Sequence, residues 1–287
     1  MMRMGLLTLI AMLAFAGNSL LCRLALASGA IDALSFTSLR LGSGALLLVL
    51  IMAPHWRRHG RRPARLSMAL MLFGYMLCFS LAYRSLSAAT GALLLFGTVQ
   101  LTMFAVALAG GERYAPRRWL GLLLALAGLV YLLLPGLSAP DPAGATLMIL
   151  SGLCWGAYSL LGRGDAHPVE TTSNNFLLAT PLALAASLLL AGPLAMPVVV
   201  QPWGLLLAVL SGALASGLGY VAWYAALRGL AAGPAATVQL SVPLLAAAGG
   251  VLLLGEALDE RLLLATPLTL IGIGLMLRPS STKEEYA

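Results

Sequence analysis

The feature that most constrains the fold is a series of ten long apolar segments joined by short connections. Each segment is about as long as the roughly 20 residues that a helix needs to cross a bilayer. Charged residues make up only 9% of the chain, against about 25% in soluble domains, and a water-soluble globule of this size could not bury so much apolar surface. The sequence therefore predicts an all-α membrane protein with ten transmembrane helices, at residues 4–24, 34–53, 66–84, 88–110, 119–135, 144–162, 171–191, 202–227, 234–254 and 262–278.

The positions of Arg and Lys predict that both termini are cytoplasmic. With the N-terminus inside, 13 of the 17 basic residues fall on the cytoplasmic side, whereas the external loops hold only Arg84 and Arg261. This asymmetry follows the positive-inside rule. Because the charge lies in short loops, the net charge of +7 indicates membrane topology and not a nucleic-acid partner. The Arg, Ala, Leu and Gly bias is typical of a GC-rich bacterial genome, so we expect a multi-pass protein of the bacterial inner membrane, in contact with the lipid bilayer.

The chain also repeats itself. Three short matches occur in the same order at nearly one offset: Phe15–Arg23 with Trp155–Arg163, Gly74-Tyr75 with Gly219-Tyr220, and Gly111-Glu112 with Gly255-Glu256. Each unit holds five segments, an odd number, so the second unit must be inverted relative to the first. We therefore expect two inverted five-helix repeats, residues 1–138 and 139–287. Transporters use such repeats to place two gates around a site near the middle of the membrane.

Polar and aromatic side chains within the apolar segments predict the wall of a cavity between the repeats. Lipid offers no hydrogen-bond partner to their polar atoms, so these side chains should face the interior, where packing between helices is the alternative role. The candidate substrate-binding residues are Asn18, Tyr75, Phe79, Gln100, Trp155, Tyr158, Tyr220, Tyr224, Gln239 and Ser241. Four other aromatic residues are expected at the membrane interfaces: Tyr83, Trp119, Trp203 and Trp223.

Two arginines lie inside predicted helices. Arg40 falls about a third of the way along its segment and should face protein, either pairing with Asp32 or helix-end carbonyls, or contacting a substrate carboxylate. Arg23 lies near the outer interface, where a long side chain is expected to reach toward the headgroups. Glu112 and Glu256 end two segments and are expected to order the loops that follow.

Small residues predict close packing of the fifth and tenth helices, at Gly121, Ala125 and Gly128 and at Ala265, Thr269 and Gly272. In the ninth segment, Pro243 is expected to free a backbone carbonyl, because a helix-interior proline removes a hydrogen bond.

Acidic side chains are missing from the middle of every segment. All ten Asp and Glu residues and the three histidines lie at segment ends, in loops or in the tail. Ion coupling usually uses an ionisable group inside the membrane, so we expect transport without an embedded acidic coupling site. Ser19, Ser159 and Ser216 likewise have no intramembrane base to activate them, which argues against an enzyme. No metal site or cofactor is predicted. A channel would need a polar filter or charged rings, and the sequence shows neither.

The two halves resemble paired units of the EamA family of the drug/metabolite transporter superfamily. The resemblance rests on the aromatic-glycine starts of the first and sixth segments, on Arg40, on Gly74-Tyr75 with its counterpart Gly219-Tyr220, and on the two Gly-Glu pairs. Phe15 departs from the family pattern, which usually has Trp there, and the fourth segment lacks a counterpart of Pro243.

This resemblance implies a secondary transporter that exports small metabolites by alternating access. Within the family the chain is most similar to an exporter of aromatic amino acids, which implies a neutral amino acid as the small-molecule substrate. Alternative cargoes are drugs, other lipophilic compounds and sugar phosphates, and an intramembrane enzyme is a remote alternative. A monomer is plausible, although the sequence leaves the oligomeric state open.

Overall fold

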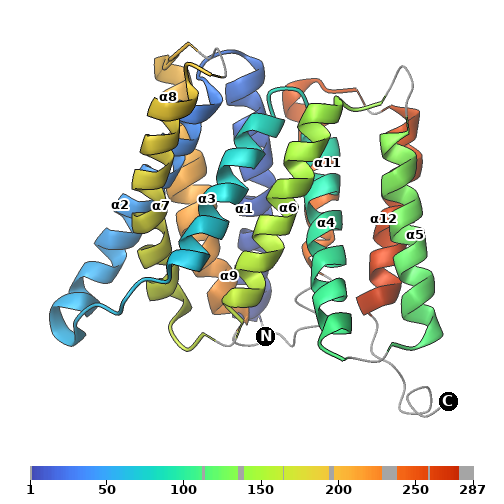
Figure 1. Ribbon diagram of the computed structural model, residues 1–287, viewed down its shortest axis with the longest axis horizontal. Coiled ribbons are helices and arrows are strands. Elements are labelled where there is room, and N and C mark those ends of the chain that lie inside the picture. Colours follow the sequence, from blue (N-terminus) through green and yellow to red (C-terminus); the bar gives the residue numbers. More distant parts are fainter. Residues whose placement is uncertain are drawn as a thin grey trace.

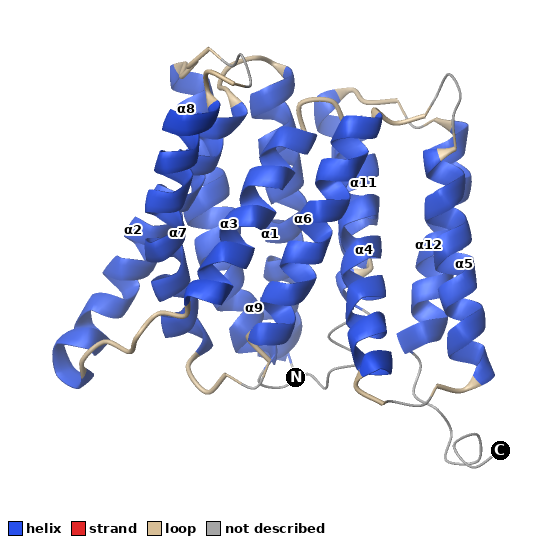
Figure 2. Ribbon diagram, in the orientation of Figure 1, coloured by secondary structure: helices blue, strands red, loops and turns tan. Residues whose placement is uncertain are grey.

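The protein is a bundle of long helices connected by short loops at its two ends (Figures 1 and 2). The computed structural model describes residues 2–111, 114–134, 139–163, 165–193, 197–227, 238–257 and 259–277. Within these ranges no β-strand occurs, and Ile31 and Val200 form an isolated antiparallel bridge. The helices are α1 (Met2–Ala27), α2 (Ala33–His59), α3 (Leu66–Ala82), α4 (Ala88–Ala109), α5 (Pro116–Leu133), α6 (Pro142–Leu161), α7 (Pro168–Leu190), α8 (Pro202–Val209), the π-helix η1 (Leu210–Leu218), α9 (Gly219–Leu227), α11 (Ser241–Leu254) and α12 (Glu260–Leu277).

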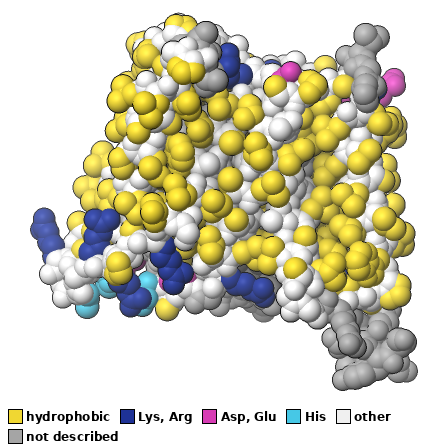
Figure 3. Space-filling model, viewed as in Figure 1, with side chains coloured by type: hydrophobic (Ala, Val, Ile, Leu, Met, Phe, Trp, Pro, Cys, Tyr) yellow, Lys and Arg dark blue, Asp and Glu magenta, His cyan; other side chains and the backbone are white. Residues whose placement is uncertain are grey.

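Each predicted apolar segment overlaps a helix, and the eighth overlaps α8, η1 and α9, which follow one another. Among the described residues, seven helices are long and apolar enough to cross a membrane, and α3 and α11 are shorter apolar helices. The yellow, apolar surface in Figure 3 covers the sides of these helices. The prediction of an all-helical multi-pass membrane protein is therefore confirmed.

The two ends of the bundle differ in charge. The first helix begins and α12 ends at the lower end in Figure 1, and dark blue basic side chains gather along that end in Figure 3. Arg57, Arg58, Arg61, Arg62 and Arg65, at the end of α2 and in the connection to α3, are all exposed. The arrangement agrees with termini on one side of the membrane, and the cytoplasmic placement of that side stays a prediction.

The N-terminus of α2 is fixed by Asp32. One carboxylate oxygen accepts hydrogen bonds from the backbone N–H groups of Leu34 and Ser35, and the other accepts one from Val199. Such an N-cap satisfies donors that the first helical turn leaves open. The expected pairing of Asp32 with Arg40 is wrong, because among the described residues no ion pair joins them and Arg40 donates to Ser216 and Tyr75 instead.

Asp141 caps α6 at the same upper end of the bundle. Its carboxylate accepts hydrogen bonds from the Gly144 backbone N–H, at 2.7 Å, and from the Ser85 hydroxyl, at 2.9 Å. These bonds favour the ionised form and lower the pKa of this carboxyl. Because Ser85 lies in the α3–α4 loop, the cap also ties that loop to the start of α6.

Helices α5 and α12 pack so closely that Gly121, Gly128 and Gly272 have no space for a side chain. A Cβ on Gly121 would collide with the backbone of Gly272, and one on Gly128 would collide with Thr269 and the backbone of Ala265. The two helices form a pair at one side of the bundle (Figure 1). The predicted close packing of the fifth and tenth helices is confirmed.

The remaining helices meet across the middle of the molecule. Helix α1 packs against α9, α11 and η1, α2 packs against α7 and η1, and both α3 and α4 pack against α6. Helices from the first half of the chain thus contact helices from the second half throughout the core. This interface is where a site shared by two repeats would lie.

A π-helix interrupts the eighth segment, which the sequence pattern did not predict. In η1 the backbone hydrogen bonds are one residue longer than in an α-helix, a feature frequent at functional sites. Gly212 within it lies against the backbone carbonyl of Arg40, where a Cβ would collide. Since Gly212 has no side chain, η1 can approach α2 at the level of Arg40.

Pro243 lies in the first turn of α11, which starts at Ser241. A proline in a first turn removes no hydrogen bond of that helix. Residues 238–239 before it are also helical and Leu240 forms a turn between them, so the free carbonyl within the ninth segment stays a prediction.

Candidate substrate cavity between the two halves

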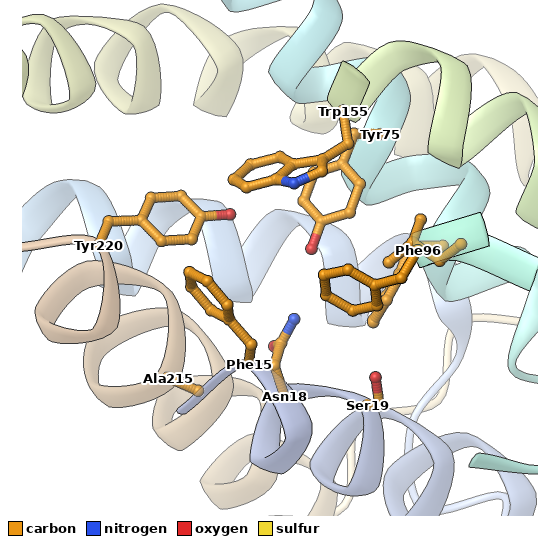
Figure 4. Close-up of a pocket in the computed structure, with 10 residues that line it drawn as sticks. Phe15, Asn18, Ser19, Tyr75, Phe96, Trp155, Ala215 and Tyr220 are labelled. Atoms are coloured by element: carbon orange, nitrogen blue, oxygen red, sulfur yellow. The ribbon is translucent and has the colours of Figure 1, made fainter. Parts of the chain in front are cut away.

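A small cavity lies in the core where α1, α3, α4, α6, η1 and α9 meet (Figure 4). Its volume is about 20 Å³, which is room for about one water molecule. A larger ligand can enter only when the lining side chains move apart. The lining residues are Phe15, Asn18, Ser19, Tyr75, Phe79, Leu95, Phe96, Trp155, Ala215 and Tyr220.

Five of the ten candidate binding residues meet at this cavity: Asn18, Tyr75, Phe79, Trp155 and Tyr220. They come from α1, α3, α6 and α9, and therefore from both halves of the chain. The sequence pattern thus selected side chains that lie together although up to 202 positions separate them.

The other five candidates lie outside the lining. Tyr158 stacks on Trp155 with ring centroids 5.5 Å apart, and Gln100 is buried in α4. Ser241 donates its hydroxyl hydrogen bond to the backbone carbonyl of Val238, which satisfies it locally. Tyr224 and Gln239 are half-buried.

The cavity wall is largely aromatic. The ring of Trp155 lies 4.8 Å from that of Tyr75 and 5.2 Å from that of Tyr220, measured between centroids. Phe15 meets Tyr220 edge to face at 6.0 Å. Such rings offer a ligand both apolar contact area and stacking.

The polar atoms of the wall are mostly hydrogen-bond donors. Asn18 uses its amide oxygen to accept a hydrogen bond from Ser211, so its NH₂ group is left to face the cavity. The hydroxyl oxygen of Tyr75 accepts a hydrogen bond from Arg40 Nη2 at 3.1 Å, which leaves its own O–H free to donate. Figure 4 shows the Asn18 amide nitrogen and the hydroxyls of Tyr75 and Tyr220 pointing toward the centre.

Arg40 lies behind the rings of Tyr75 and Phe79 and is completely buried. Its Nε donates to Ser216 Oγ at 3.2 Å, and its guanidinium carbon lies 4.9 Å from the centre of the Phe79 ring. Among the described residues, no carboxylate pairs with it and Nη1 has no hydrogen-bond partner. A buried cation without a counter-charge is costly, so the charge of Arg40 behind the lining rings would favour a ligand that brings negative charge.

An ion pair lies above the cavity, toward the upper end of the bundle. Arg23 Nε donates to Glu256 Oε1 at 2.9 Å, and the other oxygen of Glu256 accepts the backbone N–H of Ala88 at 2.8 Å. We call this pair the Arg23–Glu256 clasp, since it joins α1, the end of α11 and the start of α4. The expectation that Arg23 reaches toward lipid headgroups is wrong, because a protein carboxylate takes its charge. Glu256 orders the chain here as predicted, whereas Glu112 lies outside the described residues.

Two aromatic residues expected at the membrane interface lie in the core instead. Tyr83 is fully buried beneath the clasp and meets the Phe79 ring edge to face at 4.7 Å. Trp223 is 8% exposed and packs against Phe15. Both expectations are wrong because neighbouring helices cover these rings, whereas Trp119 and Trp203 are exposed as predicted.

A cluster of polar and aromatic side chains lies below the cavity. Tyr158, one turn below Trp155, accepts a hydrogen bond from Asn175 Nδ2 at 3.4 Å and also interacts with Thr172 and Tyr224. The clasp thus lies above the cavity and this cluster below it, and each residue that lines the cavity is at most 9% exposed.

Glu170 links α7 to the end of α2 and the connection that follows it, near the lower end of the bundle. This carboxylate is only 3% exposed and accepts hydrogen bonds from Trp56 Nε1 and from the backbone N–H of Arg62, both at 3.0 Å. It anchors the α2–α3 connection to α7. The sequence placed Glu170 at a helix end but gave no signal of its burial.

Sequence reasoning missed several lining residues. Leu95, Phe96 and Ala215 are apolar residues in apolar helices, and nothing in the pattern separates them from lipid-facing neighbours. The residues Phe15 and Ser19 flank Asn18 on one face of α1, and their match to Trp155 and Ser159 in the repeat was a usable signal. In the part of the chain that the structure describes, no group of three His, Cys, Asp or Glu side chains could hold a metal ion.

The comparisons with known proteins give the family. The model of the EamA-like transporter family matches residues 2–134 and 142–278. The chain belongs to this family. It is 57% identical over 278 residues to an uncharacterized protein of Pseudomonas aeruginosa, PA1977, covering 96% of this chain and 94% of that one. It is also 32% identical over 249 residues to the threonine/homoserine exporter RhtA of Escherichia coli, covering 85% of this chain and 79% of RhtA.

A solved crystal structure shares the fold, with a TM-score of 0.65 and 22% identity over 94% of each chain. Membership of a transporter family, together with exporter relatives, points to a transporter of small metabolites and away from an enzyme.

Proposed function

We propose that this EamA protein exports neutral amino acids, aromatic ones included, by alternating access through the cavity. The observation that carries the proposal is the wall itself, which is aromatic, rich in donors, backed by Arg40 and free of acidic side chains among the described lining residues. An amino acid would place its carboxylate at the donors and its side chain among the rings. Its ammonium group would lie against an aromatic face.

The transport cycle would use the two halves of the chain as inverted repeats, residues 1–138 and 139–287. The structure is then a closed intermediate, from which each end opens in turn. We place the protein in a bacterial inner membrane with both termini cytoplasmic, as a monomer. The similarity to the exporter RhtA supports efflux as the direction. Since no described acidic residue lines the cavity, transport would not depend on a membrane-embedded carboxylate.

Small hydroxylated amino acids are a second candidate substrate class, favoured by the similarity to a threonine/homoserine exporter. The donors that would hold the carboxylate of an aromatic amino acid would hold the carboxylate of a small hydroxylated one equally well. The aromatic wall favours the larger, apolar substrates, so phenylalanine and threonine separate the two possibilities.

Counterflow into proteoliposomes containing the purified protein tests the proposal. The probes are labelled phenylalanine, threonine, glutamate, a lipophilic cation and a sugar phosphate. We expect phenylalanine flux to be largest and threonine flux to be measurable, with glutamate, the cation and the sugar phosphate at background. Flux of the cation or of the sugar phosphate without any amino-acid flux would overturn the proposal in favour of a drug or sugar-phosphate exporter.

A further inference from the structure

The charge distribution around the cavity is one-sided. Arg40 supplies a buried positive charge that no carboxylate pairs with among the described residues. No Asp or Glu lies among the described residues that line the cavity. The charge of Arg40, behind the Tyr75 ring, would therefore favour the carboxylate of a zwitterion, whereas its ammonium group would meet ring faces and neutral hydroxyls and would be repelled by the guanidinium.

Two of the donors in the wall already accept a hydrogen bond from the protein. The amide oxygen of Asn18 is occupied by Ser211, and the hydroxyl oxygen of Tyr75 by Arg40. An indole N–H such as that of Trp155 can only donate. Asn18, Tyr75 and Trp155 thus present donors to a ligand. The hydroxyls of Tyr220 and Ser19, both buried without a partner among the described residues, could donate to a carboxylate or accept from an ammonium group.

We propose that the cavity recognises its substrates by the carboxylate and does not require the amino group. This inference rests on the proposed function and extends the substrate class to monocarboxylates with an apolar or aromatic side chain, such as 2-hydroxy acids. A 2-hydroxy acid keeps the carboxylate and the side chain of the amino acid and replaces the ammonium by a neutral hydroxyl. This exchange removes the group that Arg40 repels.

Three ligands with the same phenyl side chain separate the contributions of the carboxylate and of the ammonium group to binding. Phenylalanine carries both charged groups, 3-phenyllactate carries only the carboxylate, and 2-phenylethylamine carries only the ammonium. Binding is measured on the full-length protein in detergent as the shift of its thermal unfolding midpoint with ligand concentration. Counterflow of each compound is measured in proteoliposomes.

We expect 3-phenyllactate to bind within about threefold of phenylalanine or more tightly, and 2-phenylethylamine to bind at least 30-fold more weakly. The variant Arg40→Gln should weaken 3-phenyllactate by at least 30-fold and leave the weak binding of 2-phenylethylamine unchanged or tighter. Equal loss for all three ligands would show a general defect of the cavity and would overturn the inference.

The outcomes also separate this inference from the proposed function. If phenylalanine binds and is carried but 3-phenyllactate does neither, the amino group is required and the inference is wrong while the function stands. If 3-phenyllactate binds and is transported but no amino acid is, the protein is a monocarboxylate transporter. The proposed function then fails, whereas the inference that the cavity recognises the carboxylate holds. Tight binding of 2-phenylethylamine overturns the inference in either case.

Discussion

Replacing Arg40 by Gln is expected to reduce amino-acid counterflow about 100-fold. The change removes a fully buried charge and keeps much of the side-chain volume. In the proposed complex the charge of Arg40 acts on the substrate carboxylate. Losing one partner of such a buried charge pair costs about 2–5 kcal/mol, which brackets a 100-fold loss of affinity. The measurement is the initial counterflow rate of labelled phenylalanine, with the amount of reconstituted protein matched between variants.

Two further variants control the interpretation. Arg40→Lys keeps the charge without the fork of donors and should restore part of the flux, which a purely structural role for Arg40 would not predict. Arg84→Gln, at an exposed loop position, should transport like the unmodified protein. Flux of Arg40→Gln within twofold of the unmodified protein would show that the substrate does not depend on this charge.

Shortening Trp155 to Ala is expected to lower phenylalanine flux by at least tenfold, and Tyr75→Ala should do the same. Trp155 contacts the rings of both Tyr75 and Tyr220, so its loss removes the centre of the aromatic wall. Truncating a buried large aromatic residue typically costs about 3–5 kcal/mol, so retained folding is checked by size-exclusion chromatography and thermal unfolding. Trp203→Ala is the matched control, because Trp203 is 51% exposed on α8.

The variant Tyr75→Phe isolates the hydroxyl group from the ring. It keeps the aromatic wall but removes the donor that Arg40 polarises, so flux should fall less than in Tyr75→Ala and more than in Trp203→Ala. Equal flux in the Trp155, Tyr75 and Trp203 variants would mean that the substrate passes elsewhere.

The sequence predicted the parts of the fold that depend on composition and spacing. Lipid makes every spanning segment apolar and pairs backbone groups internally, so helix positions follow from hydropathy. The glycines Gly121 and Gly272 were recognisable because only small residues allow helices to approach so closely. Asn18, Tyr75 and Tyr220 were recognisable because a polar group inside an apolar helix must face protein.

Features that depend on long-range pairing could not be predicted. The partners Arg23 and Glu256 are 233 positions apart. The sequence places each of them correctly near a helix end but gives no signal that they pair. The pairing of Arg40 with Ser216 depends on the π-helix η1, which leaves no periodic signal in a chain rich in Ala, Leu and Gly. Phe96 is an apolar residue among apolar neighbours, and only tertiary packing places it at the cavity.

Alternating access predicts that the cavity is reached from each side of the membrane in turn. Ser19 lines the cavity, and the variant Ser19→Cys is made in a background in which Cys22, Cys78 and Cys154 are changed to Ala. A membrane-impermeant thiol reagent is applied to either face of oriented vesicles. Glu256→Gln, which removes the charge that pairs with Arg23, is the companion variant.

The rate at which the thiol of the Ser19→Cys variant is labelled from each face is the most direct test of the account. We expect labelling from both faces, a change in the ratio of the two rates when phenylalanine is added, and faster labelling from the clasp end when Glu256→Gln is also present. Labelling from a single face, at a rate that neither phenylalanine nor the loss of the Arg23–Glu256 clasp alters, would contradict it.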